Sequence, residues 1–241
     1  MNVNEIVRII PTVKVNNRKL NEKFYIGTLG MKPLLEESAF LSLGDQTGTE
    51  RLILEEAPSM RTRRVEGLKK LARLLIKVEN PSEIEGILSQ MNSLPRLFKG
   101  SCGYAFEIVS PEQDVILVHA ENDVRDLVPL ETIPEFYSNT SIKYVSQFEV
   151  SMELRLPKGT ESLLDPEGVA PAITFTKGQG PDLAVENNVT WDLTMLKFLV
   201  KNFDLTSLRQ KFENTDYFVP KSEKFFLGKD TNNIELWFEE A

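Results

Sequence analysis

The sequence predicts an α+β protein of tandem βαβββ modules, in which a strand and a helix are followed by two or three antiparallel strands. Three observations support this prediction. A β-branched run ending in Val-x-Asn occurs three times, an amphipathic segment follows each Asn, and short alternating runs joined by turn residues come next. One module cannot cover both faces of its own sheet, so we expect the modules to pair into curved mixed sheets, two modules to each of two domains.

The first copy begins with the run that ends at Val15-Asn16-Asn17. We predict that Asn17 caps the following helix, because an Asn side chain accepts a hydrogen bond from a first-turn N–H. Leu20 and Phe24 are expected on its apolar face, and Gly30 is expected to end it in a left-handed conformation. Three strand-like runs follow, with the sequences MKPLLEE, AFLSL and RLILEE.

The second copy ends its first strand at Val78-Glu79-Asn80 and carries the clearest helix signal. Asn80 is the predicted cap, with Pro81 at the first helical position and Glu83 at the third. Apolar residues then recur on one helical face, namely Ile84, Ile87, Leu88 and Met91. The runs YAFEIV and VILVHA, joined by SPEQD, predict a hairpin.

The third copy follows Val200-Lys201-Asn202 and places Leu205, Leu208 and Phe212 on one helical face. Its runs KFFLG and IELWFEE are joined by KDTNN. A decayed fourth copy is expected between Gln147 and Asn188. There FEVSMELRL and PAITFT resemble strands, whereas GTESLLDPEG replaces the helix.

These copies predict two domains separated by a proline-containing connector. Residues 1–125 hold the first two modules, and residues 126–146, with Pro129 and Pro134, form the connector. Residues 147–241 hold the degenerate module and the third clear one.

Bulk properties narrow the function classes. The net charge of −8 over 241 residues argues against a nucleic-acid binder, which normally presents a basic face. The single cysteine excludes an internal disulfide, and no apolar run is long enough to span a bilayer. The N-terminus lacks the pattern of a signal peptide, so we expect a cytoplasmic protein, with a homodimer among its expected assemblies.

The first copy resembles the vicinal-oxygen-chelate superfamily, which includes glyoxalase I, bleomycin-resistance proteins and extradiol dioxygenases. The residues that carry the resemblance are Asn17, Phe24, Tyr25, Leu29 and Gly30. The hairpins FEIVSPEQDVILV at 106–118 and LGKDTNNIELWF at 227–238 resemble its closing signature. The resemblance implies modules of glyoxalase/bleomycin-resistance type.

More narrowly, the whole chain resembles the CppA family of streptococci, named for degradation of complement component C3. The likeness covers both halves, including the poorly patterned third unit. It implies a proteinase, hence a hydrolase with a role in complement evasion and virulence. It also implies C3 as a partner and an extracellular or cell-surface role.

Strand alternation divides each first strand into two faces. The expected helix-packed residues are Ile9, Val13 and Val15, then Leu74, Ile76 and Val78, then Leu196, Phe198 and Val200. The expected cavity-facing residues are Ile10, Thr12 and Lys14, then Arg73, Leu75 and Lys77, then Met195, Lys197 and Leu199.

The metal positions of the superfamily carry unsuitable residues. The strand positions correspond to Ile10, Arg73 and Met195, and the hairpin positions to Leu117 and Glu235. A lone Glu cannot supply the convergent donors that a metal requires. The single histidine also excludes a two-histidine metal site or metalloprotease motif. We therefore expect no metal and no other cofactor.

Four residues remain as candidates for binding or catalysis. If Arg73 faces the cavity near His119, the pair could bind a small anion; otherwise Arg73 reaches solvent or pairs with a carboxylate. Glu235 is a further ligand-binding candidate, or a solvent-facing strand residue. Cys102 and His119 could form a catalytic dyad only if they come within hydrogen-bond reach.

The register of the second hairpin decides that question. A symmetric hairpin, which pairs Val109 with Val115, sets His119 opposite Ala105 and turns Cys102 to the other face.

Three functional hypotheses follow. The family resemblance implies a C3-degrading proteinase whose catalytic apparatus the sequence does not identify. The residues themselves favour a metal-free binding module for a small molecule or a protein. A thiol-dependent role for Cys102 requires an exposed thiol of low pKa.

Overall fold

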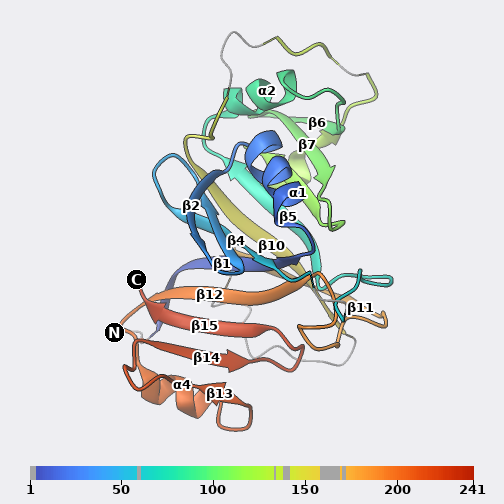
Figure 1. The fold of residues 1–241 in the computed structure, drawn as a ribbon. Helices are drawn as coiled ribbons and strands as arrows, with labels where there is room; N and C mark the ends of the chain where they lie inside the picture. Colours follow the sequence, from blue (N-terminus) through green and yellow to red (C-terminus); the bar gives the residue numbers. More distant parts are fainter. Residues whose placement is uncertain (1–3, 59–60, 133, 138–141, 158–168, 170–171) are drawn as a thin grey trace.

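The computed structural model describes residues 4–58, 61–132, 134–137, 142–157, 169 and 172–241, which form two mixed β-sheets (Figure 1). The eight-stranded sheet has the order β13-β14-β15-β12-β1-β4-β3-β2. The seven-stranded sheet has the order β11-β10-β5-β8-β7-β6-β9. No helix within these residues is long and apolar enough to cross a membrane.

The strands reproduce the expected modules, and the structure contains short strands in addition to them. The eight-stranded sheet contains β1 (Glu5–Val15), β2 (Lys32–Glu37), β3 (Phe40–Gly44), β4 (Glu50–Glu56), β12 (Leu193–Lys201), β13 (Tyr217–Phe218), β14 (Phe225–Lys229) and β15 (Glu235–Glu240). The seven-stranded sheet contains β5 (Leu71–Val78), β6 (Arg96–Gly100), β7 (Gly103–Val109), β8 (Val115–His119), β9 (Val128–Pro129), β10 (Phe148–Pro157) and β11 (Ile173–Gly178). The segment GTESLLDPEG lies outside the described residues.

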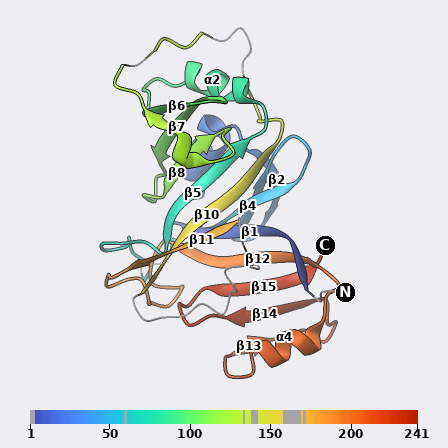
Figure 2. The ribbon, with the colours of Figure 1, turned by 180° about the vertical axis from the view of Figure 1, so that it is seen from behind.

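Each sheet combines modules from both halves of the chain. The first and third copies meet where β1 pairs antiparallel with β12, and the second copy meets the degenerate one where β5 pairs antiparallel with β10. Figure 2 shows the β5–β10 pair crossing above the β1–β12 pair. The connector at 126–146 therefore separates two halves of the sequence, while each sheet draws strands from both.

The first helix confirms its predicted cap and half of its predicted apolar face, since Phe24 packs against the core whereas Leu20 does not. The Asn17 side chain accepts from the backbone N–H of Leu20 at 2.9 Å, and α1 (Arg18–Glu22) follows. The chain then widens into the π-helix η1 (Lys23–Thr28), which shifts the phase of the residues that face the core. As a result Tyr25 is fully buried, whereas Leu20 is 52% exposed. Gly30 has the predicted positive φ, at 70°.

The second helix, α2 (Pro81–Ser89), agrees with the prediction in its cap and its buried face. Asn80 accepts from the N–H of Ser82, and Ile84, Ile87 and Leu88 are buried. The Glu83 carboxylate accepts from the backbone N–H and the hydroxyl of Ser146, at 3.0 and 2.9 Å. The first turn of α2 is thereby tied to the end of the connector.

The third helix, α4 (Leu205–Lys211), starts later than its Val-x-Asn pattern predicts. Asp204, rather than Asn202, is the cap, and its carboxylate accepts from the N–H groups of Thr206 and Ser207. Asn202 instead adopts a positive φ of 55° as the chain turns out of β12. Leu208 and Phe212 are buried as predicted.

The hydrophobic core confirms the predicted helix-packed faces of the first strands. It contains residues from all three clear copies, including Ile9, Val13, Val15, Leu74, Ile76, Val78, Leu196, Phe198 and Val200. Burial of each such side chain stabilises the fold by roughly 1.5–3 kcal/mol. Ile10 and Thr12, on the opposite face of β1, are also fully buried, so the cavity side of this strand is more enclosed than its sequence predicts.

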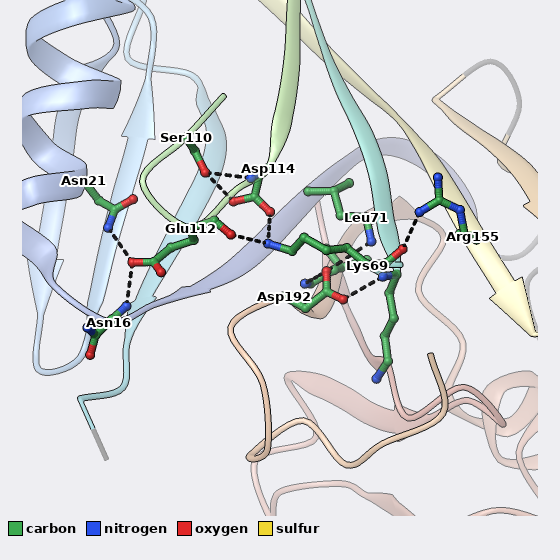
Figure 3. A network of polar contacts seen from close by, with 11 residues as sticks. Asn16, Asn21, Lys69, Leu71, Ser110, Glu112, Asp114, Arg155 and Asp192 are labelled. Carbon is green, nitrogen blue, oxygen red and sulfur yellow. Dashed lines mark hydrogen bonds and ion pairs between the residues drawn. The ribbon is translucent and has the colours of Figure 1, made fainter. Parts of the chain in front are cut away.

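A buried polar network joins the copies where the two sheets meet (Figure 3). The Lys69 ammonium pairs with Asp114 and donates to the carbonyl of Glu112 at 3.0 Å. The Asp192 carboxylate accepts from three backbone N–H groups, those of Lys70, Leu71 and Leu193.

The same network reaches the first copy through Glu112. Its carboxylate accepts from the Asn16 backbone N–H at 2.9 Å and from the Asn21 side chain at 3.1 Å. Each buried charge in the network therefore has a partner, which buried charges require in order not to destabilise the fold.

Candidate ligand-binding groove

A groove of about 460 Å³ lies on the face of the eight-stranded sheet that points away from the core. Its lining comes from β2, β3, β4, β12 and β15 and from the turn between β2 and β3. The apolar lining residues are Leu35, Phe40, Ile53, Met195 and Trp237, and the polar ones are Glu37, Ser38, Ser42, Glu50 and Lys197. The groove thus draws its residues from the first copy and the third.

Strand register brings these distant residues together. Thr12 on β1 pairs with Ile53 on β4 and with Met195 on β12, and Met195 pairs with Glu235 on β15. One step further along the sheet, Lys197 pairs with Trp237. Alternation turns these residues to the side opposite Leu196 and Phe198, which are in the core.

Lys197 is held between two carboxylates. Its Nζ lies 3.2 Å from Glu50 and 2.9 Å from Glu239, and the Ser42 hydroxyl donates to the second oxygen of Glu50. Burial alone lowers the pKa of Lys197, but the hydrogen bonds and charges of Glu239 and Glu50 outweigh it and raise the pKa above its ordinary value. Lys197 is therefore a fixed cation at neutral pH.

Trp237 has a fixed orientation beside this ion cluster. Its ring stacks on Phe225 with centroids 3.8 Å apart and an interplanar angle of 15°. Its indole N–H donates to Glu239 at 2.8 Å. Stacking and the hydrogen bond together set the plane of the indole before any ligand arrives.

A second polar cluster lies beyond Met195 on the same face. The Lys14 ammonium is 3.3 Å from Glu55 and donates to the carbonyl of Asn187 at 2.8 Å. Burial, followed by the charge of Glu55, raises the pKa of Glu235. The hydroxyl of Thr12 is buried between these groups and the groove, and has no hydrogen-bond partner among the described residues.

These residues do not suit the metal that the resemblance to the vicinal-oxygen-chelate superfamily implies. Ile10 and Met195 stand at two of the expected ligand positions, and Lys14 places an ammonium beside the carboxylate of Glu55. Across the described ranges, no group of three or more His, Cys, Asp or Glu side chains is arranged to hold a metal ion.

The three predicted ligand-binding residues lie on different sheets. Glu235 is on β15 of the eight-stranded sheet, whereas Arg73 and His119 are on β5 and β8 of the seven-stranded one. Arg73 pairs with Glu153 on the neighbouring strand at 2.5 Å, which matches the alternative of carboxylate pairing.

His119 is 4% exposed, and burial lowers its pKa to about 4. It is therefore neutral at pH 7 and supplies no charge for an anion. Binding of an anion by Arg73 and His119 stays a prediction.

The register of the second hairpin is the symmetric one. Val109 pairs with Val115, as the symmetric hairpin predicts. The half-buried Cys102 donates its backbone N–H to Glu121, and its thiol lies 3.7 Å from the Ser101 hydroxyl. Within the described residues, no hydrogen bond joins the Cys102 thiol to the His119 imidazole.

Sequence reasoning missed several groove residues. Trp237 and Glu50 escaped notice because only the first strand of each copy was divided into faces. The same alternation applied to β15 points Glu235 and Trp237 to one side. What the alternation cannot supply is the pairing of the first copy with the third, on which the groove depends.

Comparisons with known proteins assign both halves of the chain. The CppA N-terminal family model matches residues 8–130, and the CppA C-terminal model matches residues 145–238. The crystal structure of the cppA protein from Streptococcus pneumoniae TIGR4 is 67% identical, with 100% of each chain covered and a TM-score of 0.95. No curated protein matches the chain.

Distant structures share the fold alone. A putative dioxygenase from Bacillus subtilis is 12% identical, with 99% of this chain and 86% of that chain covered and a TM-score of 0.58. Glyoxalase I from Zea mays is 11% identical, with 97% and 92% covered and a TM-score of 0.55. The modules are therefore of glyoxalase type, and the chain belongs to the CppA family.

Proposed function

We propose that the protein is a metal-independent binding module that holds a small molecule in the groove of the eight-stranded sheet. The oriented indole of Trp237 carries this proposal, because it provides a rigid aromatic surface in a groove otherwise lined by Leu35, Phe40, Ile53 and Met195. A volume of about 460 Å³ suits a small organic ligand.

The polar groups of the groove favour binding over catalysis. The Ser42 hydroxyl donates to Glu50, a carboxylate that is already paired with Lys197, and the lining residues include no histidine to act as the base of an activated serine. Lys197 is kept protonated by Glu50 and Glu239, whereas a nucleophilic lysine needs a lowered pKa. These groups can orient a ligand and need not react with it.

Indole resonances provide a direct test, because the chain has two tryptophans. Trp237 lines the groove, whereas the Trp191 N–H donates to the carbonyl of Ala57. We would screen a set of small aromatic and aliphatic fragments against chelator-treated protein by ¹H–¹⁵N NMR. The proposal expects concentration-dependent shifts of the Trp237 indole signal while that of Trp191 stays in place. Fragments that shift neither signal, or Trp191 alone, contradict it.

A second candidate, degradation of complement C3, is supported by membership of the CppA family. It needs a nucleophile with a nearby base, and Cys102 and His119 are the two residues that sequence reasoning offers. A digestion time course with highly purified, chelator-treated protein would be run alongside Cys102→Ala and His119→Ala. Cleavage that disappears in one variant supports a proteinase, whereas equal cleavage by all samples indicates a contaminant.

A further inference from the structure

The groove gathers more negative than positive charge. Glu50 and Glu239 share the ammonium of Lys197, and Glu37 lines the opposite wall on β2. In the described part of the chain, Glu37 takes part in no ion pair. Arg8 on β1 also interacts with the charge of Glu50, so three carboxylates against two cations leave this region with a net charge of −1, which favours a cationic ligand over an anionic one.

The indole of Trp237 also favours a cationic ligand. Phe225 stacks on one face of the Trp237 indole. The rest of the indole lines the groove. An indole face attracts cations more strongly than a phenyl or phenol face does. Glu239 accepts from the indole N–H, and this places a carboxylate at the edge of the same ring.

The apolar residues of the groove indicate that the ligand carries an apolar body next to its charge. Leu35, Phe40 and Ile53 line the wall formed by the first copy, across the groove from Trp237 on β15. An inorganic cation would gain nothing from these side chains, whereas an aromatic or aliphatic body attached to the charge would be removed from water.

From this arrangement we infer that the groove selects a small organic cation, an ammonium or amidinium group on an apolar body. The inference rests on the proposed binding function and adds the class of ligand. Trp237, with Glu239 at the edge of its ring, would face the charge, and the wall of Leu35, Phe40 and Ile53 would hold the body. Glu37, on that wall, would add to the negative potential of the groove.

The test compares three probes of one size and different charge: benzylammonium, benzyl alcohol and benzoate. Trp191→Phe protein leaves Trp237 as the single tryptophan, whose fluorescence reports binding at pH 7. Benzylammonium is expected to bind about tenfold more tightly than benzyl alcohol, with benzoate weakest. Glu37→Gln should reduce the ratio of the benzylammonium affinity to the benzyl alcohol affinity severalfold. Glu149→Gln, an exposed position on β10, is the matched control.

The outcomes separate the ligand class from the binding function. Benzyl alcohol or benzoate that binds as tightly as benzylammonium overturns the cation preference and leaves the binding function intact. A preference for benzylammonium that survives Glu37→Gln, or that falls as much in Glu149→Gln as in Glu37→Gln, also overturns it. No Trp237 response to any probe, together with an unmoved Trp237 resonance across the fragment screen, overturns both.

Discussion

The half-buried Lys197 and the buried His119 illustrate two ways in which a titratable side chain is accommodated in this fold. Lys197 is charged because two carboxylates lie within 3.2 Å of its ammonium. His119 is neutral because burial outweighs the charge of Glu121, with Lys77 and Arg73 also disfavouring its protonated form. One side chain contributes a fixed charge to the groove, whereas the other is part of the interior of the opposite sheet.

The state of His119 predicts a pH dependence of stability. Its pKa is about 4 in the folded protein, whereas an unfolded histidine has a pKa of about 6.5. The unfolded state therefore binds more protons between these values. The stability that the protein gains from keeping His119 neutral is fully present above pH 6.5. As the pH falls towards 4, the free energy of unfolding decreases by about 3 kcal/mol on this account.

Because the chain has one histidine, His119→Gln isolates this effect. Urea unfolding at pH 7.5 and pH 4 should show wild type losing about 3 kcal/mol more than the variant over this interval. Equal losses by the two proteins would show that His119 titrates normally in the folded state.

The helices show which local signals can be read from sequence and which cannot. Asn17 and Asn80 cap their helices because each side chain reaches a first-turn N–H. Asn202 stands in the same Val-x-Asn pattern but adopts a positive φ, and Asp204 takes over the cap. The pattern alone does not distinguish an Asn that caps a helix from one that turns the chain.

Substitution at these two positions should separate the roles. Asp204→Ala is expected to destabilise the protein by about 1 kcal/mol, since the N–H groups of Thr206 and Ser207 lose their acceptor. Asn202→Gly should destabilise the protein less than Asp204→Ala does, because Asn202 does not cap the helix and glycine adopts a positive φ without strain. Urea midpoints measure both. A larger loss of stability in Asn202→Gly than in Asp204→Ala would show that Asn202 is the helix cap.

Strands were more predictable than helices for a physical reason. Each hairpin is a local structure whose turn residues and alternation lie within a few positions of each other, and the register of Val109 with Val115 is as expected. The π-helical turn around Tyr25 has no comparable signal. It contains the buried ring of Tyr25, whose neighbours Ser110 and Asp114 are far away in the sequence.

At the scale of the whole molecule, the order of the copies along the chain does not show how they pair. The first copy shares a sheet with the third, and the second with the degenerate one. The buried network of Lys69, Asp114, Glu112 and Asp192 lies where these pairs meet (Figure 3). It links residues more than one hundred positions apart, which local patterns cannot reveal.

This network predicts strong coupling between Lys69 and Asp114. Lys69→Met leaves a buried carboxylate without its cation and should destabilise the protein by about 3–5 kcal/mol. The double variant Lys69→Met/Asp114→Asn should recover part of that loss, because it no longer contains the buried Asp114 carboxylate without a cation. Denaturant unfolding of the two single variants and the double variant measures the coupling. Additive losses would mean that the two buried charges do not stabilise each other.

The central claim is that the groove of the eight-stranded sheet binds a ligand without a metal. Its most direct test is a benzylammonium titration of the Trp191→Phe protein, first treated with a chelator and then supplemented with Zn²⁺ or Mn²⁺. The account predicts the same dissociation constant from Trp237 fluorescence in all samples, and loss of binding in Trp237→Leu followed by calorimetry. Binding that appears only after a metal is added, or that survives Trp237→Leu unchanged, would contradict it.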